Sequence, residues 1–323
     1  MEKNVRLRIL LVMELFFEQT DAEHGVSMGD VLHWLEQNGI AGERKSIYED
    51  IHALQEYGLA IEYFAEDRSY RLVERAMELP ELKLLVDAVH ASKMITSKRA
   101  EQMVSHIMDL SSCYGRGELR REVYSEKPKS PNATGFYSLD LLHQAMESGK
   151  QVQFRYSAWT LEKKLSYKHD GRPYRLSPWL MVWAEENYYL VAYDEERNTF
   201  KHFRVDKISD VEILDLPRKG ESNFRKLDVV NYSTNHFGMY SGEKRRVTVQ
   251  FENSLIGVVL DRFGTELQII KEGENHFKVA LPVVVSSQFF GWILGLGSQA
   301  KILTEEVAKE YTTFVETSLN QYQ

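Results

Sequence analysis

The sequence predicts a multidomain α+β protein in four consecutive parts, and three patterns along the chain lead to this fold class. Helical periodicity followed by a hairpin pattern opens the chain, a strand-rich stretch occupies the middle, and strands alternate with helices at the end. The parts are a winged helix-turn-helix (residues 1–75), a helical connector (76–135), a small β-barrel (136–220) and a ferredoxin-like α/β unit (240–323). A chain of 323 residues has the length of two or three domains.

The first two helices of the N-terminal part follow from spacing and capping. Apolar residues recur with helical period from Val5 to Glu18. Ser27 is typical of the N-cap of a second helix, with Asp30 three residues later, and Asn38-Gly39 ends that helix. A short turn at residues 40–42 leads into a third helix.

The third helix is predicted from Glu43 to Tyr57, and Gly58 ends it. Its buried stripe is spaced i, i+4, i+7 and consists of Ile47, Ile51 and Leu54. Asp50 lies next to this stripe, so we expect its side chain to turn inward to a base on the first helix. Two strand patterns follow, at residues 59–63 and 69–73, and predict a wing.

The opposite side of the third helix presents side chains that suit DNA. The candidate DNA contacts are Arg44, Lys45, Ser46, Tyr48 and His52 on the helix and Arg68 in the wing. Acidic residues outnumber basic ones in residues 1–73, so DNA binding would depend on the local placement of bases rather than on net charge. The alternative is a helix that only packs against its neighbours.

The connector is predicted to be helical. Apolar residues recur with helical period over residues 78–112. The stretch from Arg116 to Glu126 is highly charged, and the composition of residues 127–132 indicates a linker.

One helix and about five strands are predicted for the barrel. The helix covers residues 138–148, and residues 150–157 alternate apolar and polar side chains as a half-buried strand does. Residues 163–168 and 172–177 flank Asp170-Gly171, which predicts a β-hairpin because both turn residues tolerate positive φ.

Two further strands, residues 188–193 and 200–208, bring aromatic and basic side chains side by side. Phe203 points to one face while His202 and Arg204 point to the other, because side chains alternate along a strand. We expect His202 and Arg204 to project near Tyr188, where bases can hold a phosphate and a ring can stack on a nucleobase. The candidate ligand-binding residues are Arg155, Tyr156, Arg175, Tyr188, His202 and Arg204.

Structural roles are the alternative for these side chains. Tyr189 and Tyr193 share the parity of Val191, which favours ordinary core positions for both. Arg204 could pair with Asp206, or with a carboxylate of the Glu195–Glu196 turn, and then serve stability alone.

The segment from Arg175 to Ile208 resembles the WYL domain of bacterial transcription factors. That family has the pattern Arg-x-x-Pro, then Trp-Tyr-Leu-x-Ala-Tyr, then Phe-Arg-x-Asp-Arg-Ile. Here the triplet reads Tyr188-Tyr189-Leu190 and the last basic residue is Lys207, so two signature positions depart from the pattern while keeping its chemistry. The resemblance implies an Sm-like barrel that senses nucleotides or nucleic-acid fragments, and a recognition helix at residues 43–54 that enters the major groove.

The expected function is therefore that of a homodimeric transcription regulator. Its winged helix would bind a palindromic double-stranded operator, and its barrel would sense a nucleotide or single-stranded nucleic-acid effector. The connector and the C-terminal part would supply dimer contacts. The alternative is an accessory protein whose barrel binds single-stranded nucleic acid directly.

The C-terminal part is predicted as a βαββαβ unit over residues 244–323, which suggests a ferredoxin-like sandwich. Its motif Gly295-Leu296-Gly297-Ser298-Gln299-Ala300 matches a dinucleotide fingerprint. The fingerprint requires a strand before the glycines and a helix after them, whereas this motif is expected between a helix and a strand.

Composition and motifs argue against several other classes of protein. A single cysteine, Cys113, excludes a disulfide framework and indicates a reducing compartment. No run of about 18 apolar residues is present, so we expect a cytoplasmic protein without membrane contact. The net charge of −8 does not indicate general affinity for nucleic acid. Without a nucleophile, metal-ligand or phosphate-loop motif, we expect no enzyme activity, no cofactor and no metal.

Overall fold

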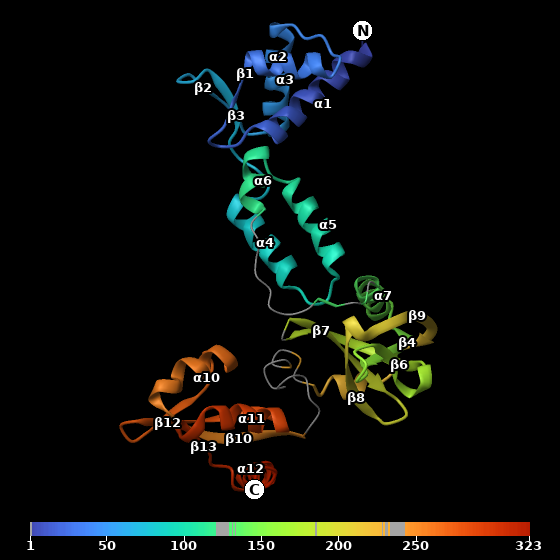
Figure 1. Cartoon of the computed structure of the whole chain (residues 1–323), viewed down its shortest axis with the longest axis vertical. Helices are drawn as coiled ribbons and strands as arrows, with labels where there is room; N and C mark the ends of the chain where they lie inside the picture. Colours follow the sequence, from blue (N-terminus) through green and yellow to red (C-terminus); the bar gives the residue numbers. More distant parts are fainter. Residues whose placement is uncertain are drawn as a thin grey trace. The chain divides into compact units, whose positions relative to one another are not determined.

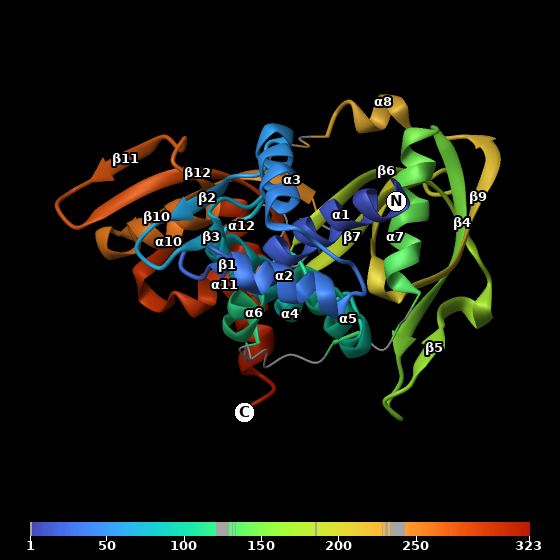
Figure 2. The same ribbon diagram turned by 90° about the horizontal axis from the view of Figure 1, so that it is seen from above.

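The chain divides into two compact units, Met1–Pro131 and Asn132–Gln323, and the division falls within the predicted linker at 127–132 (Figures 1 and 2). The computed structural model describes residues 2–120, 129–130, 132, 134–184, 186–227, 229, 232 and 243–323, with side chains from residue 6 onward. Among these residues, no helix is both long and apolar enough to cross a bilayer.

The first unit begins with three helices and a small antiparallel sheet (Figure 1). The helices are α1 (Glu2–Gln19), α2 (Met28–Gln37) and α3 (Arg44–Tyr57). The strands are β1 (Val26–Ser27), β2 (Ile61–Phe64) and β3 (Ser69–Leu72), in the order β1-β3-β2. The helices and strands share one core, in which Phe16, Leu35, Ile47 and Leu72 are almost completely buried.

Capping residues set the helix ends as the sequence predicts. The Ser27 side chain accepts from the backbone N–H of Asp30, and the Asp30 carboxylate accepts from the backbone N–H of Ser27, which makes a capping box. Gly58 ends α3 with φ of 111°, a left-handed conformation that glycine adopts without steric cost. Both predicted helix boundaries are confirmed.

The connector helices complete the first unit. They are α4 (Leu79–Ala91), α5 (Ser97–Met108) and α6 (Cys113–Leu119), and α4 and α5 lie side by side (Figure 1). Their core is small and centres on Leu82, Val86 and Leu119. The ammonium group of Lys129 donates to the carbonyls of Val89, His90 and Ser92, so it caps the C-terminal end of α4. The rest of the predicted linker, apart from Ser130 and Asn132, lies outside the described residues.

The second unit begins with α7 (Gly135–Glu147) and a curled sheet of six strands, one more than predicted. The strands are β4 (Lys150–Trp159), β5 (Leu165–Tyr167), β6 (Tyr174–Ala184), β7 (Asn187–Asp194), β8 (Thr199–Arg204) and β9 (Ile208–Pro217). The order is β5-β4-β6-β7-β8, and β9 returns to pair with β4, which curls the sheet. Helix α7 lies against β4 and β9 (Figure 2).

The predicted hairpin around Asp170-Gly171 is wrong. Both β5 and β6 pair with β4 instead of with each other. His169, Asp170 and Gly171 all have positive φ and form a short 3-10 turn, which carries the chain away from a two-residue hairpin geometry.

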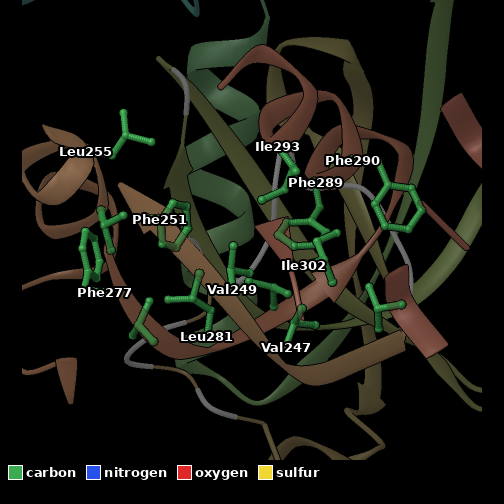
Figure 3. Close-up of a cluster of buried hydrophobic side chains, with 14 residues drawn as sticks. Val247, Val249, Phe251, Leu255, Phe277, Leu281, Phe289, Phe290, Ile293 and Ile302 are labelled. Carbon is green, nitrogen blue, oxygen red and sulfur yellow. The ribbon is translucent and has the colours of Figure 1, made fainter. Parts of the chain in front are cut away.

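The C-terminal part consists of a four-stranded antiparallel sheet and its helices. The elements are β10 (Glu243–Glu252), α10 (Ile256–Phe263), β11 (Ile269–Glu272), β12 (His276–Val285), α11 (Ser287–Gly295), β13 (Ala300–Ile302) and α12 (Glu305–Leu319). The predicted βαββαβ order of elements is confirmed, and the strands lie in the order β11-β12-β10-β13. Residues such as Phe251, Leu281 and Phe289 fill its core (Figure 3). The glycine motif at 295–300 joins a helix to a strand as expected, which does not suit a dinucleotide.

Candidate functional site

Helix α3 exposes most of the predicted DNA-contact residues on one side. Arg44, Lys45, Tyr48 and His52 are exposed, whereas Ser46 is half-buried. The imidazole Nδ1 of His52 lies 3.6 Å from a carboxylate oxygen of Glu56, one helical turn later. The stripe on the other side of α3, which includes Ile47, is buried as predicted.

Arg68 is exposed in the turn between β2 and β3, with φ of 56°. The same part of the molecule holds an aromatic group that the sequence analysis missed. The rings of Tyr63 and Tyr70 are 4.9 Å apart, and burial, together with the neighbouring Tyr48 and Tyr63, raises the pKa of Tyr70. Tyr48 of α3 therefore adjoins the wing strands. The sequence pattern of each strand taken alone does not indicate this group of tyrosines, because the group depends on how the wing packs on α3.

A buried ion pair fixes how α3 is rotated against α1. The guanidinium of Arg8 contacts both carboxylate oxygens of Asp50, at 2.5 and 3.1 Å, and Asp50 is buried. This bidentate bond raises the pKa of Arg8. The prediction that Asp50 turns inward to a base on the first helix is confirmed. The pair neutralises Asp50 inside the unit, so its negative charge does not repel DNA phosphate near α3.

The register of β7 and β8 corrects the predicted ligand face. Arg204 lies opposite Tyr189, and His202 lies opposite Val191, so these four side chains share one face of the sheet. Tyr188 belongs to the other face, where its ring contacts Trp183 at 4.6 Å. The expectation that His202 and Arg204 project near Tyr188 is wrong, because period 2 gives parity within a strand but not the register between strands.

His202 lies in an apolar cluster instead of an open pocket. Its Nε2 is 2.8 Å from the hydroxyl of Tyr232, and Tyr232 packs with Tyr189 and Val191. Burial raises the pKa of Tyr232 to about 12. This environment stabilises a local core on the outer face of β7 and β8, and the contact with Tyr232 gives His202 a structural role there.

Arg204 is the last residue of β8 and pairs with a carboxylate two residues later. Its Nε and Nη2 donate to the two oxygens of Asp206 at 3.0 and 2.8 Å. The pairing with Asp206 that the sequence left open is therefore present. The backbone N–H of Arg204 donates to the hydroxyl of Tyr156, a half-buried residue whose pKa burial raises to about 12.

The two remaining arginines of the predicted set, Arg155 and Arg175, have neighbours other than Arg204. Arg155 is on the outer face of β4, where it pairs with Asp210 at 3.0 Å and its guanidinium lies 5.6 Å from the Tyr167 ring centre. Arg175 is exposed at the start of β6, opposite Gln153. Tyr189 of β7 lies opposite Arg204 on one side and opposite Val182 of β6 on the other. Val182 is seven positions after Arg175 along β6. The structure therefore does not bring Arg175 and Arg204 together.

The structure adds Lys207 and Lys168, which the sequence analysis did not select. Burial lowers the pKa of Lys207, and the nearby cations Arg204 and Lys168 lower it further, against the effect of Asp206. The ammonium group of Lys168 lies 5.8 Å from the ring centre of Tyr156. Arg204 and Lys168 thus lie close enough to Lys207 to repel its charge, and Asp206 offsets part of this repulsion. A bound anion would be stabilised here, because it would offset their mutual repulsion.

Lys207 also lines a pocket of about 280 Å³. The pocket is lined by Asn132, Ser157, Leu165, Tyr167, Lys207 and Ser209. Its volume lies just below the range of roughly 300–1,000 Å³ for small-molecule sites. An exposed tyrosine ring, two serine hydroxyl groups and one ammonium group suit a stacked base and a phosphate. Lys207 occupies the last basic position of the signature pattern, a signal that could have identified it. Lys168 and Tyr167 carry no such signal because the turn at 168–171 brings them there.

Comparison with known proteins identifies one domain. Residues 138–213 match the family model of the WYL domain, so this part of the chain is a WYL domain. Among solved structures, the chain is similar to proteasome accessory factor B/C (PafBC) of Arthrobacter aurescens, with 16% identity and a TM-score of 0.27. That match covers 100% of this chain and 49% of the other, so this chain spans about half the length of PafBC. A search of curated proteins found no match.

The raised pKa of Tyr156 leads to a testable dependence of stability on pH. Its pKa is about 12 in the folded chain against the ordinary tyrosine value of 10.0, so its contribution is present below pH 10 and is lost as pH rises towards 12. At pH 11 the loss from one such group is about 1.4 kcal/mol. We expect Tyr156→Phe to lose less unfolding free energy than wild type between pH 9 and 11, measured by urea denaturation. Equal losses in both proteins would show that Tyr156 ionises normally.

Proposed function

We propose that the chain is a DNA-binding transcription regulator whose WYL domain senses a nucleotide or a short single-stranded nucleic acid. The observation that carries the proposal is a WYL domain at 138–213 in the same chain as α3, a helix with an exposed basic and aromatic side. In this proposal, DNA binding belongs to the N-terminal part and effector sensing belongs to the pocket beside Lys207.

In this proposal, residues 1–75 act as a winged helix-turn-helix. Helix α3 enters the major groove, and its N-terminal residues Arg44, Lys45 and Ser46 meet base edges and phosphates. Tyr48 and His52 extend the contact along α3, and Arg68 reaches the DNA backbone from the wing. The Arg8–Asp50 pair supports this arrangement, because it holds α3 in one rotation and keeps one acid away from the DNA.

The effector site proposed here differs from the face expected from sequence. Lys207 and Lys168 hold the phosphate, and Arg204, already paired with Asp206, adds positive charge behind them. Tyr167 offers its ring to the base, and Tyr156 anchors the backbone of Arg204. A bound effector would act by changing the populations of two arrangements that differ in the spacing of their recognition helices.

The second candidate is an accessory protein whose WYL domain binds single-stranded nucleic acid as its main task. The pocket at Lys207 supports this candidate equally well, whereas the exposed bases of α3 favour the regulator. Titrating the full-length chain with duplex and with single strands separates the two. High affinity for single strands with no affinity for duplex would select the accessory protein. We propose no enzymatic activity.

Assembly gives a further expected result. One recognition helix reads few base pairs, so a regulator of this kind binds as a two-fold pair. We expect a dimer at micromolar concentration by light scattering, and two chains on one palindromic site. A monomer that binds a full site one-to-one would contradict this part of the proposal.

A further inference from the structure

A cavity of about 560 Å³ lies inside the first unit, apart from the WYL domain. It is bounded by the loop after α1, the end of β3, the start of α4 and the start of α6. Small-molecule sites have volumes of roughly 300–1,000 Å³ and lie preferentially between substructures. This cavity has both properties, because the α3-bearing part and the connector helices each supply a wall.

The floor of the cavity is apolar and its rim is acidic. Leu72 and Leu82 on the floor are each 1% exposed, and Met77 and Leu79 are half-buried beside them. The exposed carboxylates at the rim are Glu23, Glu74, Glu78 and Glu118, of which Glu118 pairs with Lys83 and Glu78 caps the start of α4. A ligand that fits this cavity has an apolar body, which lies on the floor, and a charged group, which lies at the rim.

The positive side chain in the wall is already engaged. The guanidinium of Arg75 donates to the main-chain carbonyls of Phe17 and Thr20 at 2.7 Å, and of Leu110 at 3.3 Å. Burial lowers the pKa of Arg75, which shows the cost of holding its charge there. An anion would therefore meet the acidic rim with little compensation, whereas a cation would be attracted to it.

An aromatic surface completes the wall. The rings of His24 and Tyr114 stack at 3.8 Å with an interplanar angle of 8°, and Asp21 accepts hydrogen bonds from His24 and Ser112. These contacts hold the loop after α1 against the start of α6. The exposed tyrosine ring offers a flat face to an apolar group or an ammonium group.

We propose that this cavity binds a small organic amine with an apolar body. The apolar body lies against Leu72 and Leu82, and the ammonium group lies at the rim near Glu23 and Glu74. Such a ligand has the opposite charge to the effector proposed for Lys207, so the two sites differ in chemical specificity. Because its walls come from both parts of the first unit, an occupant would stiffen the junction between α3 and the connector.

The test uses the full-length chain with 3-phenylpropylamine as the cationic probe and 3-phenylpropan-1-ol as its neutral counterpart. Calorimetry at low salt should show the amine binding roughly fivefold more tightly than the alcohol, as expected for exposed ion pairs. The double variant Glu23→Gln/Glu74→Gln should bring the two affinities together. The matched control Glu36→Gln/Glu101→Gln removes two exposed carboxylates outside the cavity and should keep the difference.

Melting curves establish that both variants fold, as expected for exposed side chains. The proposal is overturned if the folded wild type binds neither probe at millimolar concentration, or binds both equally. It is also overturned if the amine keeps its advantage in Glu23→Gln/Glu74→Gln, because the charge preference would then arise elsewhere. These outcomes do not depend on DNA binding or on the WYL pocket, so the failure of one proposal leaves the other testable.

Discussion

A double variant carrying Arg44→Ala and Lys45→Ala should bind duplex DNA roughly a hundredfold more weakly than the wild type. Each lost contact to a base or phosphate costs about 1–3 kcal/mol, and 1.4 kcal/mol corresponds to a factor of ten. Both side chains are exposed at the N-terminal end of α3, the end that meets base edges when such a helix enters the major groove. Fluorescence anisotropy with DNA from upstream of the protein's own gene measures the effect.

The dependence on salt distinguishes phosphate contacts from indirect effects. Each lost phosphate contact should reduce the slope of log affinity against log salt by about 0.9. The matched control Lys98→Ala/Lys226→Ala removes two exposed lysines outside α3 and should leave the slope and the affinity as in the wild type. Unchanged affinity in a folded Arg44→Ala/Lys45→Ala protein would remove α3 from the DNA interface.

Replacing Lys207 with glutamine should weaken binding of a short 5′-phosphorylated thymidine oligonucleotide about ten- to hundredfold. A hydrogen bond to a charged group contributes about 1.5–3 kcal/mol, which corresponds to that range. Lys207 lines the pocket with Tyr167 and lies near Lys168 and Arg204. Anisotropy of the labelled oligonucleotide measures the affinity.

The matched control for this variant is Arg175→Gln, since Arg175 is a basic residue of the same domain that the structure places away from the pocket. It should bind the oligonucleotide as the wild type does. A loss in Arg175→Gln with none in Lys207→Gln would instead support the face expected from sequence. The pKa of Lys207 is lowered in the free protein, and a bound phosphate favours the charged form. Binding should therefore take up protons at pH values above that lowered pKa, and weaken as pH rises there.

The features of the fold that depend on residues close together in the sequence could be predicted from the sequence. The capping box at Ser27 and Asp30 and the glycine at the end of α3 act within one helical turn, so their residue types are enough. The inward turn of Asp50 followed from its place beside the stripe of α3. The opposite faces of Phe203 and Arg204 followed in the same way from the alternation of side chains along one strand.

The arrangement between strands could not be predicted from the same patterns. Whether Tyr188 or Tyr189 faces Arg204 is a matter of register, and a shift of one residue exchanges the two. The return of β9 to β4, and the approach of Lys168 to Lys207, depend on long-range pairing and on three consecutive residues with positive φ. The proposed ligand pocket therefore lies at Lys207 instead of on the face of His202, and it combines a basic and an aromatic side chain.

The central claim is that an effector in the WYL pocket alters DNA binding by α3. The most direct measurement is the affinity of the full-length chain for labelled upstream duplex, with and without oligonucleotide at the wild-type dissociation constant, for wild type and for Lys207→Gln. We expect the oligonucleotide to change the duplex affinity of the wild type and to leave that of Lys207→Gln unaltered, with equal affinities in its absence. An identical response to oligonucleotide in both proteins, or no response in the wild type, would contradict the claim.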